Sequence, residues 1–181
     1  MKKIILLSIV LFSSKCVHSQ WSVDHITVAR FFPGAVTAQN KVYIAGGYIS
    51  NTPGVMSNRI DIYDNATGTW NIDSLSSPRG DVACAYLSNK LFFAGGTTNA
   101  FGSAKEVDIY NILTSTWSVD SLLTYQSVAI PVVISNKILF AGGVATGGVG
   151  VTKPLVFMMI LPACGRKIHF LLGGLDMQAL Q

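Results

Sequence analysis

The chain has 181 residues, of which 50% are hydrophobic and 12% are charged, and it contains 17 glycines. This length is sufficient for one domain with a buried core, and the mixture of β-branched and aromatic residues with Gly, Ser, Thr and Asn predicts short strands and many turns. The formal net charge of +4 overstates the basicity, because Lys2, Lys3 and Lys15 lie near the N-terminus. No run of Lys or Arg follows them, which argues against a nucleic-acid partner.

Residues 1–19 have the pattern of a signal peptide. The basic pair Lys2-Lys3 precedes a short apolar run, and cleavage is expected after Ser19. The apolar run is too short to remain as a membrane span, so no transmembrane segment is expected after cleavage. The pattern predicts a secreted or periplasmic protein.

Four short strands are expected next, near residues 34–37, 41–45, 59–63 and 69–72. Asn40 and the segment 65–68 supply turn residues between them, and Gly68 suits a positive φ. Such a set of strands predicts a four-stranded antiparallel sheet, hence an all-β fold.

The same pattern then recurs along the chain with offsets of 49 and 47 residues. Each unit has an apolar strand that ends in two glycines, and in two units a Tyr and a Trp follow, seven residues apart. These signature residues are Gly46, Gly47, Tyr63 and Trp70; Gly95, Gly96, Tyr110 and Trp117; and Gly142 and Gly143. Fixed-period self-similarity of this kind is typical of repeat architectures.

These units resemble kelch repeats, whose pattern is a strand ending in Gly-Gly followed by a Tyr and a Trp. The resemblance covers about residues 20–153 and implies a partial β-propeller, with about two complete four-stranded blades and part of a third. It also implies that Trp21–Asp24, which repeats the phrase around Trp70, is a closing strand for a final blade. The Tyr and Trp side chains are expected to fill the space between blades.

The pattern stops after Lys153. An apolar run from Leu155 to Leu161 stands where a Val-Asp-Ile-Tyr phrase is due, and a shifted reading frame recovers Tyr, Trp and Asp at kelch spacing. Residues 154–181 are therefore interpreted as an anomalous, out-of-frame tail on a truncated repeat array. A short membrane segment and a divergent capping strand are the alternatives.

The sequence offers no catalytic constellation, no metal-ligand spacing and no cofactor-binding motif. The candidate ligand-binding residues are Arg30, Arg79 and Gln126, each 16 residues before the first glycine of its pair, and Tyr48 after the first pair. The kelch resemblance implies that an arginine at this place faces the central cavity and binds an anion. The alternative interpretation is that each arginine binds loop carbonyls between blades. The loops 49–58 and 97–104 form a second candidate surface.

The sequence thus predicts a non-catalytic extracellular binding module that contacts a protein or a glycan. One alternative is a kelch carbohydrate-active enzyme of the sialic-acid mutarotase type. Another is a truncated product without function.

Overall fold

The computed structural model describes residues 23–26, 28–49, 54–100, 102–122, 125–144, 155–159 and 170–172. The predicted signal peptide and most of the predicted out-of-frame tail lie outside these ranges. Both interpretations therefore stay predictions.

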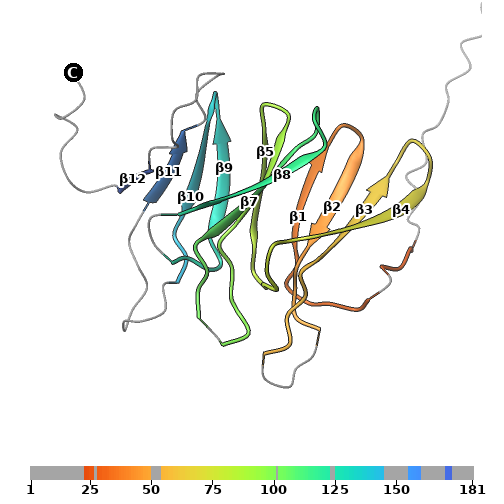
Figure 1. The fold of residues 1–181 in the computed structure, drawn as a ribbon, viewed down its shortest axis with the longest axis horizontal. Coiled ribbons are helices and arrows are strands. Elements are labelled where there is room, and N and C mark those ends of the chain that lie inside the picture. The colour runs from red at the N-terminus through yellow and green to blue at the C-terminus, as the bar shows by residue number, and fades with distance from the viewer. Residues whose placement is uncertain are drawn as a thin grey trace, which may run out of the picture.

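The described residues form three four-stranded antiparallel sheets that lie side by side (Figure 1). The first sheet contains β1 (Gly34–Ala38), β2 (Lys41–Ala45), β3 (Arg59–Asp64) and β4 (Thr69–Ser74). The second contains β5 (Ala83–Leu87), β6 (Lys90–Ala94), β7 (Glu106–Asn111) and β8 (Thr116–Ser121). The third contains β9 (Ile130–Ile134), β10 (Lys137–Ala141), β11 (Leu155–Met159) and β12 (Phe170–Leu172). The all-β prediction and the four strands expected between residues 34 and 72 are confirmed.

Tight turns explain why each sheet begins with a hairpin. Gln39 and Asn40 between β1 and β2 both have positive φ, at 47° and 62°, and Ser88 and Asn89 repeat this at 50° and 60°. Two consecutive positive φ angles give the turn twist that matches a right-handed pair of strands, and Asn tolerates this conformation.

The core lies between the sheets, where alternate residues of each strand face opposite neighbours. Between the first and second sheets, Ala45 and Ile60 meet Leu91 and Phe93, and all four are fully buried. On the other face of the second sheet, Phe92 and its neighbours pack against the third sheet. The innermost strands β1, β5 and β9 follow one another in contact. This arrangement makes each sheet depend on its neighbours for burial.

Two features differ from the sequence-based expectations. The third sheet has four strands, because 155–159 and 170–172 occupy its third and fourth positions. Of the predicted closing strand at Trp21–Asp24, the described residues Val23 and Asp24 belong to no strand. Trp21 lies outside the described residues. The described parts of the chain also contain no helix of the length and apolarity required to cross a membrane.

Candidate binding surface

The residues that precede each first strand hold neighbouring sheets together. The Arg79 side chain is fully buried, and its guanidinium donates to the carbonyl oxygens of Gly95 and Glu106 at 2.7 and 2.9 Å and pairs with Asp108 of the second sheet. Its backbone binds the first sheet instead, because the Arg79 carbonyl accepts from the Gly47 amide at 2.9 Å. Arg79 therefore connects two sheets.

Arg30 and Gln126 occupy the same place in the other two units. Arg30 donates to the Arg59 carbonyl at 3.0 Å and pairs with Asp61 of the first sheet. Gln126 is 1% exposed, and its amide donates to the Gly142 carbonyl of the third sheet. These contacts match the interpretation in which the side chains bind loop carbonyls. A ligand role for Arg30, Arg79 or Gln126 stays a prediction.

Burial has an electrostatic consequence at both arginines. Desolvation lowers the pKa of the Arg30 and Arg79 guanidinium groups from their ordinary value, and the partners Asp61 and Asp108 oppose that shift. An arginine remains protonated even so, and each buried charge is therefore compensated by a buried carboxylate.

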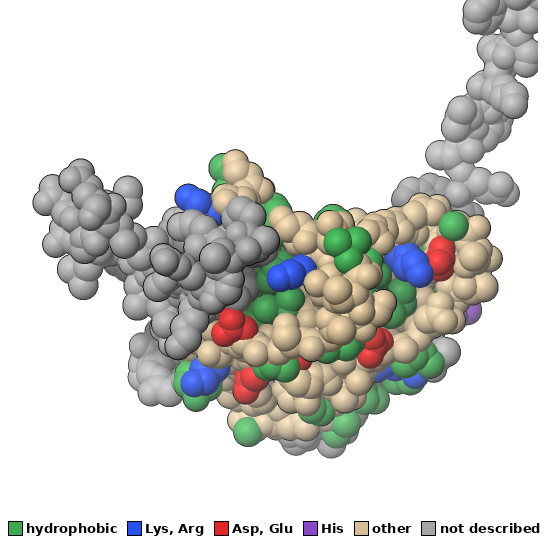
Figure 2. Space-filling model, turned by 45° about the horizontal axis from the view of Figure 1, so that its top comes forward, with side chains coloured by type: hydrophobic (Ala, Val, Ile, Leu, Met, Phe, Trp, Pro, Cys, Tyr) green, Lys and Arg blue, Asp and Glu red, His purple; other side chains and the backbone are tan. Residues whose placement is uncertain are grey.

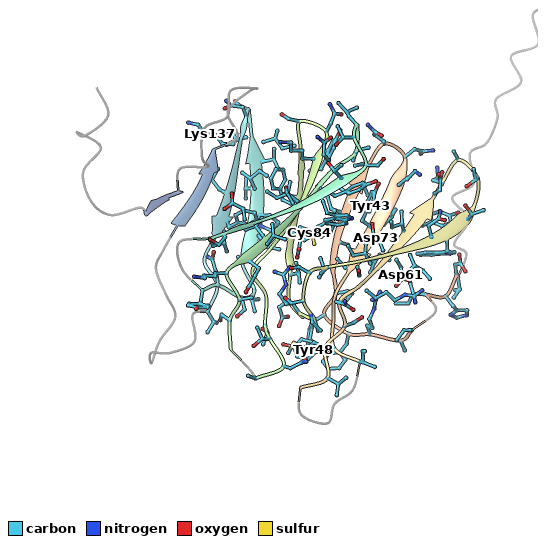
Figure 3. All side chains as sticks on the ribbon, in the orientation of Figure 1. Tyr43, Tyr48, Asp61, Asp73, Cys84 and Lys137 are labelled. Carbon is cyan, nitrogen blue, oxygen red and sulfur yellow. The ribbon has the colours of Figure 1, made fainter. Side chains whose placement is uncertain are left out.

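Tyr48 lies at the end of the sheets opposite Lys137 (Figure 3). Its backbone pairs with Phe31 through hydrogen bonds of 3.1 and 2.8 Å, and the two rings stack with centroids 4.9 Å apart. Phe32 meets both rings edge-on, at 5.4 and 6.2 Å. Phe32 is 66% exposed and Phe31 is 37% exposed, while Tyr48 is half-buried, so the three rings form an aromatic cluster that exposes two of its members.

A carboxylate adjoins this aromatic cluster. The Tyr48 hydroxyl donates to Oδ2 of Asp81 at 2.7 Å, and the Thr97 hydroxyl donates to the same oxygen at 3.0 Å. Burial raises the pKa of the Tyr48 hydroxyl above its ordinary value, which keeps it a neutral donor. Among the described residues no group donates to Oδ1 of Asp81, so this oxygen is available to accept a hydrogen bond from a ligand.

The aromatic cluster is specific to the first unit. Gly80 and Thr97 stand at the Phe31 and Tyr48 positions in the second unit, and Ser127 and Val144 stand there in the third, with matching backbone bridges. A Cβ on Gly80 would lie 2.3 Å from the Tyr48 ring, so Gly80 makes room for it. The core residues are similar in the three units, whereas the residue types at these loop positions differ from unit to unit. This combination is typical of recognition loops on a fixed scaffold.

Backbone strain recurs beside the cluster. Phe32, Asp81 and Val128 occupy equivalent positions before the first strand of each sheet, and their φ angles are 49°, 51° and 56°. Positive φ is unfavourable for residues with a Cβ, especially bulky or β-branched ones. All three units nevertheless retain a side chain here, and those of Phe32 and Val128 are exposed.

Sequence reasoning selected Tyr48 but missed Phe31, Phe32 and Asp81. The available signal was the Phe-Phe pair beside the Arg30 position, because exposed adjacent aromatic residues are uncommon in a repeat of otherwise small loop residues. On the face drawn in Figure 2, basic and acidic side chains are scattered and do not gather into one patch. In the described ranges no group of three or more His, Cys, Asp or Glu side chains is arranged to hold a metal ion.

The geometry of stacked four-stranded sheets defines part of a β-propeller. The family model described as the kelch motif matches residues 29–72. The solved structure of YjhT superimposes with a TM-score of 0.69 at 16% sequence identity, over 84% of this chain and 48% of the YjhT chain. Residues 29–72 thus match the kelch motif, and the chain has the fold of part of a β-propeller. The chain spans about half the length of the YjhT chain. No curated protein matches it.

Proposed function

We propose that the chain is a non-catalytic binding module whose exposed aromatic cluster contacts a glycan. The observation that supports this is the grouping of Phe31, Phe32 and Tyr48 with Asp81 at one end of the sheets. Aromatic rings offer flat apolar faces on which a sugar ring can stack, and Oδ1 of Asp81 offers an acceptor for a sugar hydroxyl. A protein ligand is the second candidate, because aromatic residues also dominate protein interfaces.

The setting proposed for this binding is outside the cytoplasm. Residues 1–19 have the composition of a signal peptide, and the buried Cys84 is free in the structure. The fold therefore requires no disulfide at Cys84 in a secreted or periplasmic compartment.

The experiment is a binding screen on immobilised neutral and acidic oligosaccharides with four forms of the chain. Phe32→Ala removes the most exposed ring, and Asp81→Asn retains the shape but removes the charge. Ile72→Ala is the matched control, since Ile72 is 62% exposed on β4 outside the cluster. We expect Phe32→Ala to weaken binding by about tenfold or more, the scale of an interface anchor. Equal binding by all four forms would contradict the proposed site.

The enzyme alternative is tested separately. A mutarotase would accelerate the interconversion of sialic-acid anomers, which can be followed by NMR with the intact chain. We expect the rate to equal the uncatalysed rate, because the buried candidate side chains Arg79 and Gln126 are engaged in contacts between sheets. If the wild-type chain accelerates the interconversion and Phe32→Ala does not, the chain is catalytic and the non-catalytic proposal is overturned. The aromatic cluster would still be the binding site.

A further inference from the structure

Asp81 carries a negative charge that no basic side chain neutralises within the described ranges of the chain. Three other aspartates of these ranges each form an ion pair with a lysine or an arginine: Asp61, Asp64 and Asp108. Asp81 is half-buried, and its side chain accepts only from the neutral hydroxyls of Tyr48 and Thr97. The carboxylate therefore lacks the cation that compensates a charge partly removed from water.

The arginines closest in sequence to the aromatic cluster and to Asp81 do not supply this cation. Arg79 precedes Asp81 by two residues, but its guanidinium is fully buried and pairs with Asp108 on β7. Arg30 stands at the equivalent place in the first unit, and its guanidinium pairs with Asp61 on β3. Both basic groups already have a carboxylate partner, so the charge of Asp81 is available to a cation from outside the chain.

Two hydroxyls orient the Asp81 carboxylate. Tyr48 and Thr97 both donate to Oδ2, at 2.7 and 3.0 Å, whereas Oδ1 accepts from no described group. The second oxygen is thus held in place by the first while it stays open to a charged donor on a ligand. Hydrogen bonds between a charged donor and a carboxylate are stronger than those between neutral groups.

The backbone conformation at Asp81 does not by itself require a carboxylate. The equivalent residues Phe32 and Val128 have φ angles of 49° and 56°, against 51° for Asp81. An aromatic residue and a β-branched residue therefore occupy the same turn conformation in the other two units. The charge at Asp81 is a property of this one junction between units rather than of the turn.

Asp81 lies beside the most exposed ring of the aromatic cluster. The Asp81 amide donates to the Phe32 carbonyl at 3.1 Å. Tyr48 contacts both residues, because its ring meets the Phe32 ring edge-on with centroids 6.2 Å apart and its hydroxyl donates to Asp81. The carboxylate and the Phe32 ring are therefore separated by no more than one tyrosine, which is within the length of a short oligosaccharide.

The arrangement of the rings favours a sugar over a simple ammonium ion. Proteins that bind an ammonium group alone surround it with the faces of several aromatic rings. Here Phe31 and Tyr48 stack with 17° between their planes, so each covers one face of the other, and Phe32 meets both edge-on. The three rings form no cage, but Phe32 is 66% exposed and offers a flat surface for a sugar ring.

We infer that the ligand of this surface is a glycan that carries a free amino group. The inference rests on the proposed function, because the sugar ring stacks on the same aromatic cluster, and it adds the charge of the ligand. The protonated amine donates to Oδ1 of Asp81 and supplies the missing positive charge. A sugar hydroxyl in its place leaves the carboxylate uncompensated, and an acidic sugar is repelled by it.

The experiment compares two oligosaccharides of equal length that differ in charge. Chitosan oligomers carry a free amine on each sugar, and chitin oligomers carry an uncharged acetamide at the same position. In calorimetric titrations of the full chain at about pH 6 and low salt, we expect chitosan to bind about tenfold or more tightly than chitin. Added salt should reduce this difference, because it screens the interaction between the amine and the carboxylate.

Asp81→Asn keeps an acceptor oxygen for the Tyr48 and Thr97 hydroxyls, and we expect it to bind the two oligomers equally. Asp120→Asn is the matched control, because it removes the same charge from β8, outside the cluster. In the described ranges Asp120, like Asp81, has no lysine or arginine partner. Asp120→Asn should retain the wild-type preference for chitosan. Equal circular dichroism melting transitions for the two variants exclude misfolding as the cause.

The outcomes separate this inference from the proposed function. Equal wild-type binding of chitin and chitosan that is lost in Phe32→Ala would overturn the inference and leave the glycan site in place. A preference for chitosan that persists in Asp81→Asn would exclude Asp81 as its source. Tighter binding of a lysine-rich peptide than of chitosan would overturn the inference in favour of a protein ligand. Binding of neither oligomer would also overturn it, and the proposed function fails as well only if the whole glycan screen is negative.

Discussion

At the scale of single residues, the charged pair of Arg79 and Asp108 shows how the repeat uses a polar group inside its core. The guanidinium and carboxylate are both almost completely buried, and Asp108 also accepts from the Ser76 amide at 3.1 Å. The third unit replaces this pair by Gln126 and Val156, since the register of β10 with β11 places Val156 at the Asp108 position. Gln126 is a neutral donor at a position where no carboxylate is available to compensate an arginine. This substitution therefore avoids an uncompensated buried charge.

Removing one partner of this pair is therefore expected to be costly. Arg79→Ala leaves Asp108 buried and unpaired, and we expect it to lower the free energy of unfolding by about 3–5 kcal/mol in urea titrations. The partly exposed pair of Lys41 and Asp64, at 3.1 Å, is the control, and Lys41→Ala should cost less than about 1 kcal/mol. The double variant Arg79→Gln/Asp108→Val copies the third unit and should recover part of the loss. Equal costs for Arg79→Ala and Lys41→Ala would contradict the compensating role of Arg79.

The buried thiol of Cys84 gives a pH-dependent signal at the same scale. Burial raises its pKa to about 12, from an ordinary value of 9.0. The folded state thus favours the neutral thiol, and this contribution is complete below pH 9 and lost as the pH rises towards 12. Relative to Cys84→Ala, the free energy of unfolding of wild type should decline across that interval. An unchanged difference between the two proteins from pH 8 to 11 would contradict the buried position of the thiol.

At the scale of elements, close backbone approach is the feature that joins one sheet to the next. The glycine at the end of β6, Gly95, lies against the carbonyl of Gln126, which belongs to the following unit. Trp117 adds a second connection, because it packs on Phe93 and Tyr110 and donates to Asp73 of the first sheet. Each sheet is thus fixed to its neighbour at one end and along its outer edge.

Gly95→Ala should separate the effect of this approach from that of backbone strain. Gly68→Ala carries a similar positive φ in open space and should cost about 1–2 kcal/mol. Gly95→Ala adds a collision with a backbone oxygen, which cannot move without displacing the next sheet, so we expect a loss about 2 kcal/mol larger or more. Chemical denaturation monitored by circular dichroism measures both. A Gly95→Ala protein as stable as Gly68→Ala would show that the sheets are not in close contact there.

At the scale of the whole molecule, the repeated residues made the architecture predictable and the changing residues did not. Period-2 alternation and the Asn turns placed β1 to β4 within one or two residues, because these signals are local. The pairing of Arg79 with Asp108 was not predicted, although both residues were visible in the repeat, since it depends on which way a loop turns between sheets. The aromatic cluster was only partly predicted for the same reason. Phe31 and Tyr48 are brought together by a backbone bridge, and Asp81, which accepts a hydrogen bond from Tyr48, belongs to the next unit.

The sheets pack face to face around shared cores, and Cys84 lies between the first two sheets (Figure 3). Thiol labelling at pH 8, in a Cys16→Ser/Cys164→Ser background, tests it most directly. We expect Cys84 to react only as fast as the chain unfolds, with a rate that rises with urea in step with global unfolding. Rapid labelling in the absence of urea, at the rate of a free thiol, would contradict the packed arrangement of the sheets.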